Sequence, residues 1–159
     1  SGPNLVIDVD AELDDRIRDV YEDEEQEKSG QGRVITPVVR SAIEKRAMVV
    51  AASYYKRKGY NVIDLSKRQP FDLLCKRAKR RIYVEVKGSQ NRLERIFVTE
   101  NEIRHAKKYT KYSALFLVGN INIKGKGKST TGYGGKIKII FPWRIVKSKL
   151  KALTYIYTL

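Results

Sequence analysis

The stretch that decides the fold is RQPFDLLCKRAKRRIYVEVKGSQ, residues 68–90. It holds two apolar segments, residues 71–76 and 81–87, and five of the six residues from 76 to 81 are Lys or Arg. Apolar and β-branched residues favour strands, so the stretch is typical of two strands joined by a basic turn. Side chains alternate along a strand, which places Glu85 and Lys87 on one face, roughly 6.5 to 7 Å apart. An antiparallel neighbour then brings Asp72 beside Glu85.

Two carboxylates that converge on one point repel each other, and a hard divalent cation relieves that repulsion. Bound Mg²⁺ can polarise a phosphodiester and lower the pKa of a water, and an amine such as Lys87 can neutralise developing charge. The alternative is structural: Asp72 and Glu85 pair with arginines of the turn, each pair stabilising the fold by less than about 1 kcal/mol. The spacing alone is weak evidence, but residues 29–159 contain only seven acids, and this scarcity favours a metal site over surface ion pairs.

Working outward, the clearest helix follows Thr36, a suitable N-cap, and Pro37, a suitable first residue, and Gly59 can end it. Its apolar stripe has 3.6-residue spacing and comprises Val39, Ile43, Ala47, Val50 and Tyr54. Strands are expected at 60–66, 71–76, 81–87 and 95–99. A second helix starts at Thr99, which forms a capping box with Glu102. Residues 114–118 are apolar throughout, as in a strand covered on both faces.

The C-terminal part is expected to contain a flexible basic loop at 125–135, a strand at 136–141 and a basic helix in RIVKSKLKAL, residues 144–153. The overall prediction is an α/β fold, a central mixed sheet flanked by helices in the order αβββαβ. Residues 1–32 are predicted to be an acidic arm or short helix, and residues 33–159 a single domain.

Charge is distributed unevenly between these two parts. Residues 1–28 carry eleven acids and three bases, a net charge of −8, whereas the remaining 131 residues carry 30 bases and seven acids, a net charge of +23. The positive charges of residues 29–159 repel one another, and binding to a phosphate backbone would reduce that repulsion. The arm is either a solubilising tail or a segment that covers the basic face and competes with nucleic acid.

The form P-F-D, twelve residues, then E-V-K resembles the active site of the PD-(D/E)xK nuclease superfamily, which includes many restriction and repair endonucleases. That resemblance implies a restriction-endonuclease-like core. It also implies Asp72, Glu85 and Lys87 as catalytic residues, Asp72 and Glu85 as metal ligands, and Mg²⁺ or Mn²⁺ as cofactor. Relatives often add a helical glutamate, and Glu44 is the residue that matches. Here Pro70 precedes the aspartate by two positions instead of one.

The segments GYNVIDLS, PFDLLC, IYVEVKGS, IFVTENEIRHA and YSALFLV, within residues 40–120, resemble more narrowly the domain at the C-terminus of the plant protein NO VEIN. Similar domains occur beside helicase or restriction modules, which implies such partner domains. Gln90 matches a polar position that supports the site in relatives. Double-strand cutters commonly pair two such sites, so a homodimer is an open expectation.

Nucleic-acid contacts are expected from two basic clusters, the turn and the glycine-rich loop: Lys76, Arg77, Lys79, Arg80, Lys124, Lys126 and Lys128. The single cysteine, Cys75, lies in an apolar run and is expected to be buried. His105 is expected at the surface, and Trp143 to pack the C-terminal segment. GKGKST lacks the first glycine of a phosphate-binding loop, because position 122 is Asn122.

These observations predict a metal-dependent endonuclease domain acting on DNA, in restriction, defence or repair, with RNA as the alternative substrate. The competing hypothesis is a catalytically inactive nuclease-fold module that binds DNA or RNA. With one cysteine, no apolar run long enough to span a membrane and no secretory signal, we expect a cytoplasmic, nucleoid-associated or nuclear location and no membrane partner.

Overall fold

The computed structural model describes residues 6–8, 35–153, 157 and 158. Most of the predicted acidic arm, including its helical stretch, lies outside the described residues. Its segment Val6–Asp8 forms strand β1. No helix in these described ranges is both long and apolar enough to cross a membrane.

Helix α2, Pro37–Arg57, begins and ends where the sequence predicts. The Thr36 hydroxyl accepts a hydrogen bond from the Val39 amide at 3.3 Å, and Gly59 has a φ of 82°, the left-handed conformation that ends helices. The buried residues of the helix are Ala42, Ile43, Ala47, Ala51 and Tyr55. The stripe is therefore rotated slightly from the predicted one, with small alanines where the helix lies closest to the sheet.

A five-stranded mixed sheet in the order β2-β3-β4-β6-β7 confirms the predicted α/β class. Strands β2 (Asn61–Asp64), β3 (Leu73–Arg77) and β4 (Arg80–Gly88) form the antiparallel meander. The chain then crosses through β5 (Ile96–Val98) and helix α3 (Glu100–Lys108). A short 3-10 turn, Thr110–Tyr112, leads to β6 (Ser113–Lys124), which pairs parallel with β4.

The region after β6 differs from its prediction. Strand β7, Thr131–Ile140, begins well before the expected residue 136, so β6 and β7 form a long hairpin with a 3-10 turn, Gly127–Ser129, at its tip. The expected basic helix is wrong: residues 144–153 contain a 3-10 turn at Lys147–Lys149 and strand β8, Leu150–Ala152. Trp143 is buried, and Ile145 and Leu150 pack against the same apolar cluster. Packing of these side chains against the core favours an extended backbone here, and it outweighs the helical spacing of the apolar residues in 144–153.

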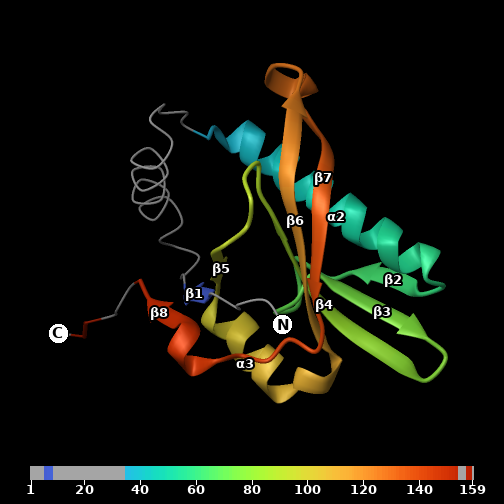
Figure 1. The fold of residues 1–159 in the computed structure, drawn as a ribbon, viewed down its shortest axis with the longest axis vertical. Coiled ribbons are helices and arrows are strands. Elements are labelled where there is room, and N and C mark those ends of the chain that lie inside the picture. Colours follow the sequence, from blue (N-terminus) through green and yellow to red (C-terminus); the bar gives the residue numbers. More distant parts are fainter. Residues whose placement is uncertain (1–5, 9–34, 154–156, 159) are drawn as a thin grey trace.

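Two apolar clusters cover the two faces of the sheet, one beneath α2 and one beneath α3, the two helices labelled in Figure 1. On one face α2 packs on Val84, Val86 and Phe116. On the other face Ile103 and Ala106 of α3 pack with Leu115, Leu117 and Trp143. A second, smaller sheet in the order β5-β1-β8 lies beside α3, and β1 pairs parallel with both of its neighbours.

Candidate active site

Asp72 lies immediately before β3, at the point where that strand leaves its ladder with β4. Its backbone amide donates to the Val84 carbonyl at 2.9 Å, and its carboxylate Oδ2 accepts from the Val86 amide at 2.8 Å. The Asp72 carboxylate thus accepts the hydrogen bond that a backbone carbonyl of β3 would otherwise accept from the Val86 amide. These two bonds hold Asp72 against the Val84–Val86 segment, which has Glu85 at its centre. The sequence prediction that Asp72 lies beside Glu85 is consistent with this arrangement.

Glu85 and Lys87 form an ion pair on the α3 face of β4. Lys87 Nζ lies 2.7 Å from Glu85 Oε1 and 3.3 Å from Glu102 Oε2. The side chains are 5% exposed for Glu85, 17% for Glu102 and 23% for Lys87. Glu102 also accepts from the Thr99 amide at 3.0 Å, completing the predicted capping box. One carboxylate therefore caps α3 and contacts the lysine of β4.

Glu102 is the residue that sequence reasoning missed. Its spacing from Thr99 explained it as a helix cap, and nothing local to the sequence places α3 against Lys87. We call Asp72, Glu85, Lys87 and Glu102 the carboxylate–lysine cluster. When all four groups are ionised it carries a net charge of −2.

Burial governs the protonation of the two β-strand carboxyls. It raises the pKa of Asp72 to about 6, although the Val86 amide and the Lys87 ammonium act to lower it. It also raises the pKa of Glu85 well above its ordinary value, against the lowering effect of Lys87. Burial by itself would lower the pKa of Lys87, but Glu85 and Glu102 together hold it above its ordinary range. The lysine is therefore charged. Ionisation of the two carboxyls is unfavourable because they are buried, and a nearby cation would make it more favourable.

The donor set suits one kind of metal. Two neighbouring carboxylates supply hard oxygens, and Mg²⁺ typically binds through one or two carboxylates, keeping waters and substrate phosphates as its other ligands. No group of three His, Cys, Asp or Glu side chains within the described residues is placed to hold a metal by itself. The pair thus fits Mg²⁺ or Mn²⁺ better than an ion that needs a complete protein cage.

The structure does not bring Glu44 into the cluster. Glu44 is exposed on α2, which packs on the opposite face of the sheet from Glu85. No ion pair or hydrogen bond recorded for the described part of the chain joins it to Asp72 or Glu85. Gln90 lies two residues beyond β4 and is half-buried. The predicted roles of Glu44 and Gln90 stay predictions.

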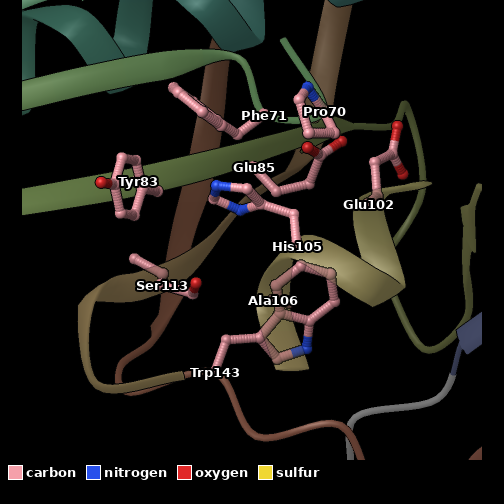
Figure 2. Close-up of a pocket in the computed structure, with 10 residues that line it drawn as sticks. Pro70, Phe71, Tyr83, Glu85, Glu102, His105, Ala106, Ser113 and Trp143 are labelled. Carbon is pink, nitrogen blue, oxygen red and sulfur yellow. The ribbon is translucent and has the colours of Figure 1, made fainter. Parts of the chain in front are cut away.

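A small pocket next to the cluster is lined by Glu85 and Glu102 together with aromatic rings (Figure 2). Its water-accessible volume of about 10 Å³ is roughly what one water molecule needs. His105 is half-buried here, against the prediction of a surface position: its ring centroid lies 4.8 Å from those of Phe71 and Tyr83 and 4.7 Å from that of Tyr109. Burial, with a smaller effect of Lys108, lowers the pKa of His105.

The basic turn lies far from the carboxylates. Arg77 pairs with Arg80 at the closed end of the β3–β4 hairpin, whereas Asp72 and Glu85 lie at its open end, five residues or roughly 16 Å away. The structural alternative, in which turn arginines neutralise these acids, is therefore wrong. Lys76, Lys79 and Arg80 are exposed, and Arg77 stacks on Tyr60 with its guanidinium carbon 4.6 Å from the ring centroid.

Comparison with known proteins identifies one family. A search of curated proteins and a search of solved structures each gave no significant match. The family model described as "Protein NO VEIN, C-terminal" matches residues 43–130, which is more than half of the chain. The match runs from within α2 through the meander, α3 and β6, and so includes every member of the carboxylate–lysine cluster. The chain therefore belongs to the NO VEIN C-terminal family.

Proposed function

We propose that this chain is a metal-dependent endonuclease domain that hydrolyses DNA phosphodiester bonds. The observation that carries the proposal is the carboxylate–lysine cluster. The 131 residues from 29 to 159 contain only seven acids, and three of them surround Lys87. A protein that needed only surface ion pairs would not gather its few acids in a half-buried group with excess negative charge, because burial of charge is unfavourable.

Each side chain has a distinct role in this proposal. Asp72 and Glu85 would hold Mg²⁺ or Mn²⁺, which supplies a Lewis acid for the phosphodiester and acidifies a water. Lys87 stays protonated and neutralises negative charge that develops on the phosphate oxygens. Glu102, fixed by the α3 cap, would keep Lys87 in position while Glu85 serves as a metal ligand.

Cleavage of supercoiled plasmid DNA with Mg²⁺ or Mn²⁺ tests the assignment. We expect Asp72→Ala and Lys87→Ala each to lower the nicking rate by about 100-fold or more, since one removes a metal ligand and the other the neutralising charge. Glu94→Ala, at an exposed position outside the cluster, is the matched control and should retain the wild-type rate. Equal nicking by all three variants would show that the cluster is not catalytic.

The second candidate is a nucleic-acid-binding module without catalysis. The observation that favours it is the +23 charge of residues 29–159, which explains binding to a polyanion without any chemistry. Binding that weakens steeply with salt, together with no cleavage of DNA or RNA under any divalent cation, would favour this module over the endonuclease. The same assay on RNA distinguishes the two substrates.

A further inference from the structure

The β6–β7 hairpin is positively charged along its whole length. Residues 113–140 contain five lysines (Lys124, Lys126, Lys128, Lys136 and Lys138) and no acid. All five are exposed, and the tip of the hairpin projects at the top of the molecule, beyond the crossing of α2 (Figure 1). The sequence prediction included the first three of these lysines and left out Lys136 and Lys138.

Strand register determines which face each lysine occupies, because directly paired residues have side chains on the same face. Leu117 packs on the α3 face, and it pairs with Lys87 on one side and with Lys138 on the other. Lys87 and Lys138 are therefore two strands apart on one face, about 10 Å between backbones. Lys136, two residues before it in β7, shares that face with Lys138.

The same face continues to the tip. The alternation shifts at Gly134 and Gly135, whose φ angles are 67° and 107°. Beyond them a Cβ on Gly132 would lie 2.8 Å from Arg46 Cβ, so position 132 faces α2. Tyr133, its neighbour, points the other way and is 46% exposed. Lys124 joins it there, with Nζ 5.5 Å from the centroid of the Tyr133 ring. We call Lys124, Tyr133, Lys136 and Lys138 the basic ribbon.

The opposite face of the hairpin is held against α2. Arg46 Nε donates to the Gly134 carbonyl at 3.0 Å, and a Cβ on Gly132 would lie 3.0 Å from the Ala42 carbonyl oxygen. Only glycine permits so close an approach of strand to helix at position 132. The hairpin is thus fixed on one side, and the exposed side is the one that carries the carboxylate–lysine cluster.

The length of the basic ribbon suits a duplex. Seven residues separate Leu117, opposite Lys87, from Lys124, which corresponds to about 23 Å at 3.3 Å per residue. A nucleic-acid duplex rises about 3.4 Å per base pair, so the ribbon runs alongside about seven base pairs. Nothing acidic on the hairpin interrupts the path.

We propose that the basic ribbon is the docking surface for duplex nucleic acid and holds about seven base pairs to one side of the reacting phosphate. The position of that phosphate rests on the proposed function, whereas the docking itself does not. Three lysines that contact phosphates release counterions, which makes binding strongly dependent on salt.

Fluorescence anisotropy with a labelled 24-base-pair duplex and a 24-nucleotide single strand, both in EDTA, tests the ribbon. The test variant is Lys124→Gln/Lys136→Gln/Lys138→Gln, and the matched control is Lys45→Gln/Lys56→Gln/Lys58→Gln, which removes three exposed charges from α2 and its C-cap. Each lost phosphate contact reduces the magnitude of the negative slope of log affinity against log salt by about 0.9. We expect the magnitude of the slope for duplex to shrink by about 2.7 in the ribbon variant and by less than about 0.5 in the control.

Equal losses in the two variants would overturn the ribbon, because general charge would then explain binding. Loss of single-strand binding with duplex binding intact would overturn the duplex assignment. Both readouts are independent of catalysis. Absence of cleavage by the wild type would refute the proposed function and leave the basic ribbon unaffected. An unchanged salt slope in the ribbon variant would refute the basic ribbon and leave the proposed function unaffected.

Discussion

The two faces of β4 use burial in opposite ways. Val84 and Val86 face α2 and are 0% and 8% exposed, while Glu85, between them, is buried on the face toward α3. The valines add to the apolar core by leaving water. The glutamate is kept from water beside two other carboxylates and one lysine. A strand that alternates in this way has one face that stabilises the fold and one that carries a buried group of ionisable side chains.

Ionisable groups make the same contrast. On the α2 face, burial raises the pKa of Cys75 to about 12 and raises that of Tyr55 above its ordinary value, so both are neutral near pH 7. On the α3 face the negative charges cannot all be neutralised at once, since three carboxylates share one ammonium. Burial of neutral groups is compatible with stability, whereas burial of excess charge costs stability and marks a candidate functional site.

The largest expected loss of stability comes from a substitution in the apolar core between α2 and the sheet. Phe116 is fully buried and its ring lies 5.5 Å from that of Tyr54, centroid to centroid. We expect Phe116→Ala to lower the free energy of unfolding by about 3 to 5 kcal/mol, because it leaves a cavity between α2 and the sheet. Urea denaturation measures the change. A loss under about 1 kcal/mol would mean that α2 is not packed on this face as described.

A smaller effect of opposite sign is expected on the charged face. The pKa of Asp72 is about 6 in the folded protein, against an ordinary value of 3.8, so the folded state binds this proton more tightly. The stabilisation from that proton is complete below about pH 3.8 and is lost as the pH rises through 6. At pH 8 in EDTA, Asp72→Asn should therefore raise the free energy of unfolding by about 2 to 3 kcal/mol.

The Asn side chain can still accept the bond from the Val86 amide through its carbonyl oxygen. The gain should fade as the pH is lowered from 6 to 4, where the wild-type carboxyl is itself protonated. Glu94→Gln, at an exposed position, should show neither effect. A variant less stable than the wild type at pH 8 would mean that ionised Asp72 stabilises the fold as a structural partner of Lys87.

The smallest expected effect compares the two helix caps. Thr36 caps α2 and Thr99 caps α3, each through a hydroxyl that accepts a backbone amide. Thr36→Ala and Thr99→Ala should each cost about 1 kcal/mol of stability. Only Thr99→Ala should also slow plasmid nicking, by several-fold, because only α3 carries a residue, Glu102, that contacts Lys87. Equal nicking by the two variants would show that the cap does not position the cluster.

Local signals in the sequence predicted the elements in which they occur. The Thr36–Pro37 start, the Thr99–Glu102 capping box and the alternation in β4 all correspond to the structure. The motif then predicted the pair Asp72 and Glu85, because neighbouring strands of a hairpin have only one register that buries their apolar residues. The order αβββαβ is likewise confirmed as a mixed sheet with a helix on each face.

What sequence could not supply depends on contacts between distant segments. Glu102 meets Lys87 across 15 residues of chain, and His105 is enclosed by rings from β4 and from the segment before β3. The glycines of 125–135 indicated a loop, but Gly132 and Gly134 are strand residues, and Gly132 lets β7 approach α2. In each case a residue with a sufficient local explanation has a second role that only tertiary packing reveals.

The bond from the Val86 amide to the Asp72 carboxylate has a spectroscopic consequence. An amide proton that bonds to a carboxylate responds to any change in the charge on that oxygen, whether the change comes from a proton or from a divalent ion. Val86 itself is apolar, is 8% exposed and takes no part in the proposed chemistry. Its backbone resonance is therefore an intrinsic reporter of occupancy at the site, readable by nuclear magnetic resonance without a substrate, a label or a substitution.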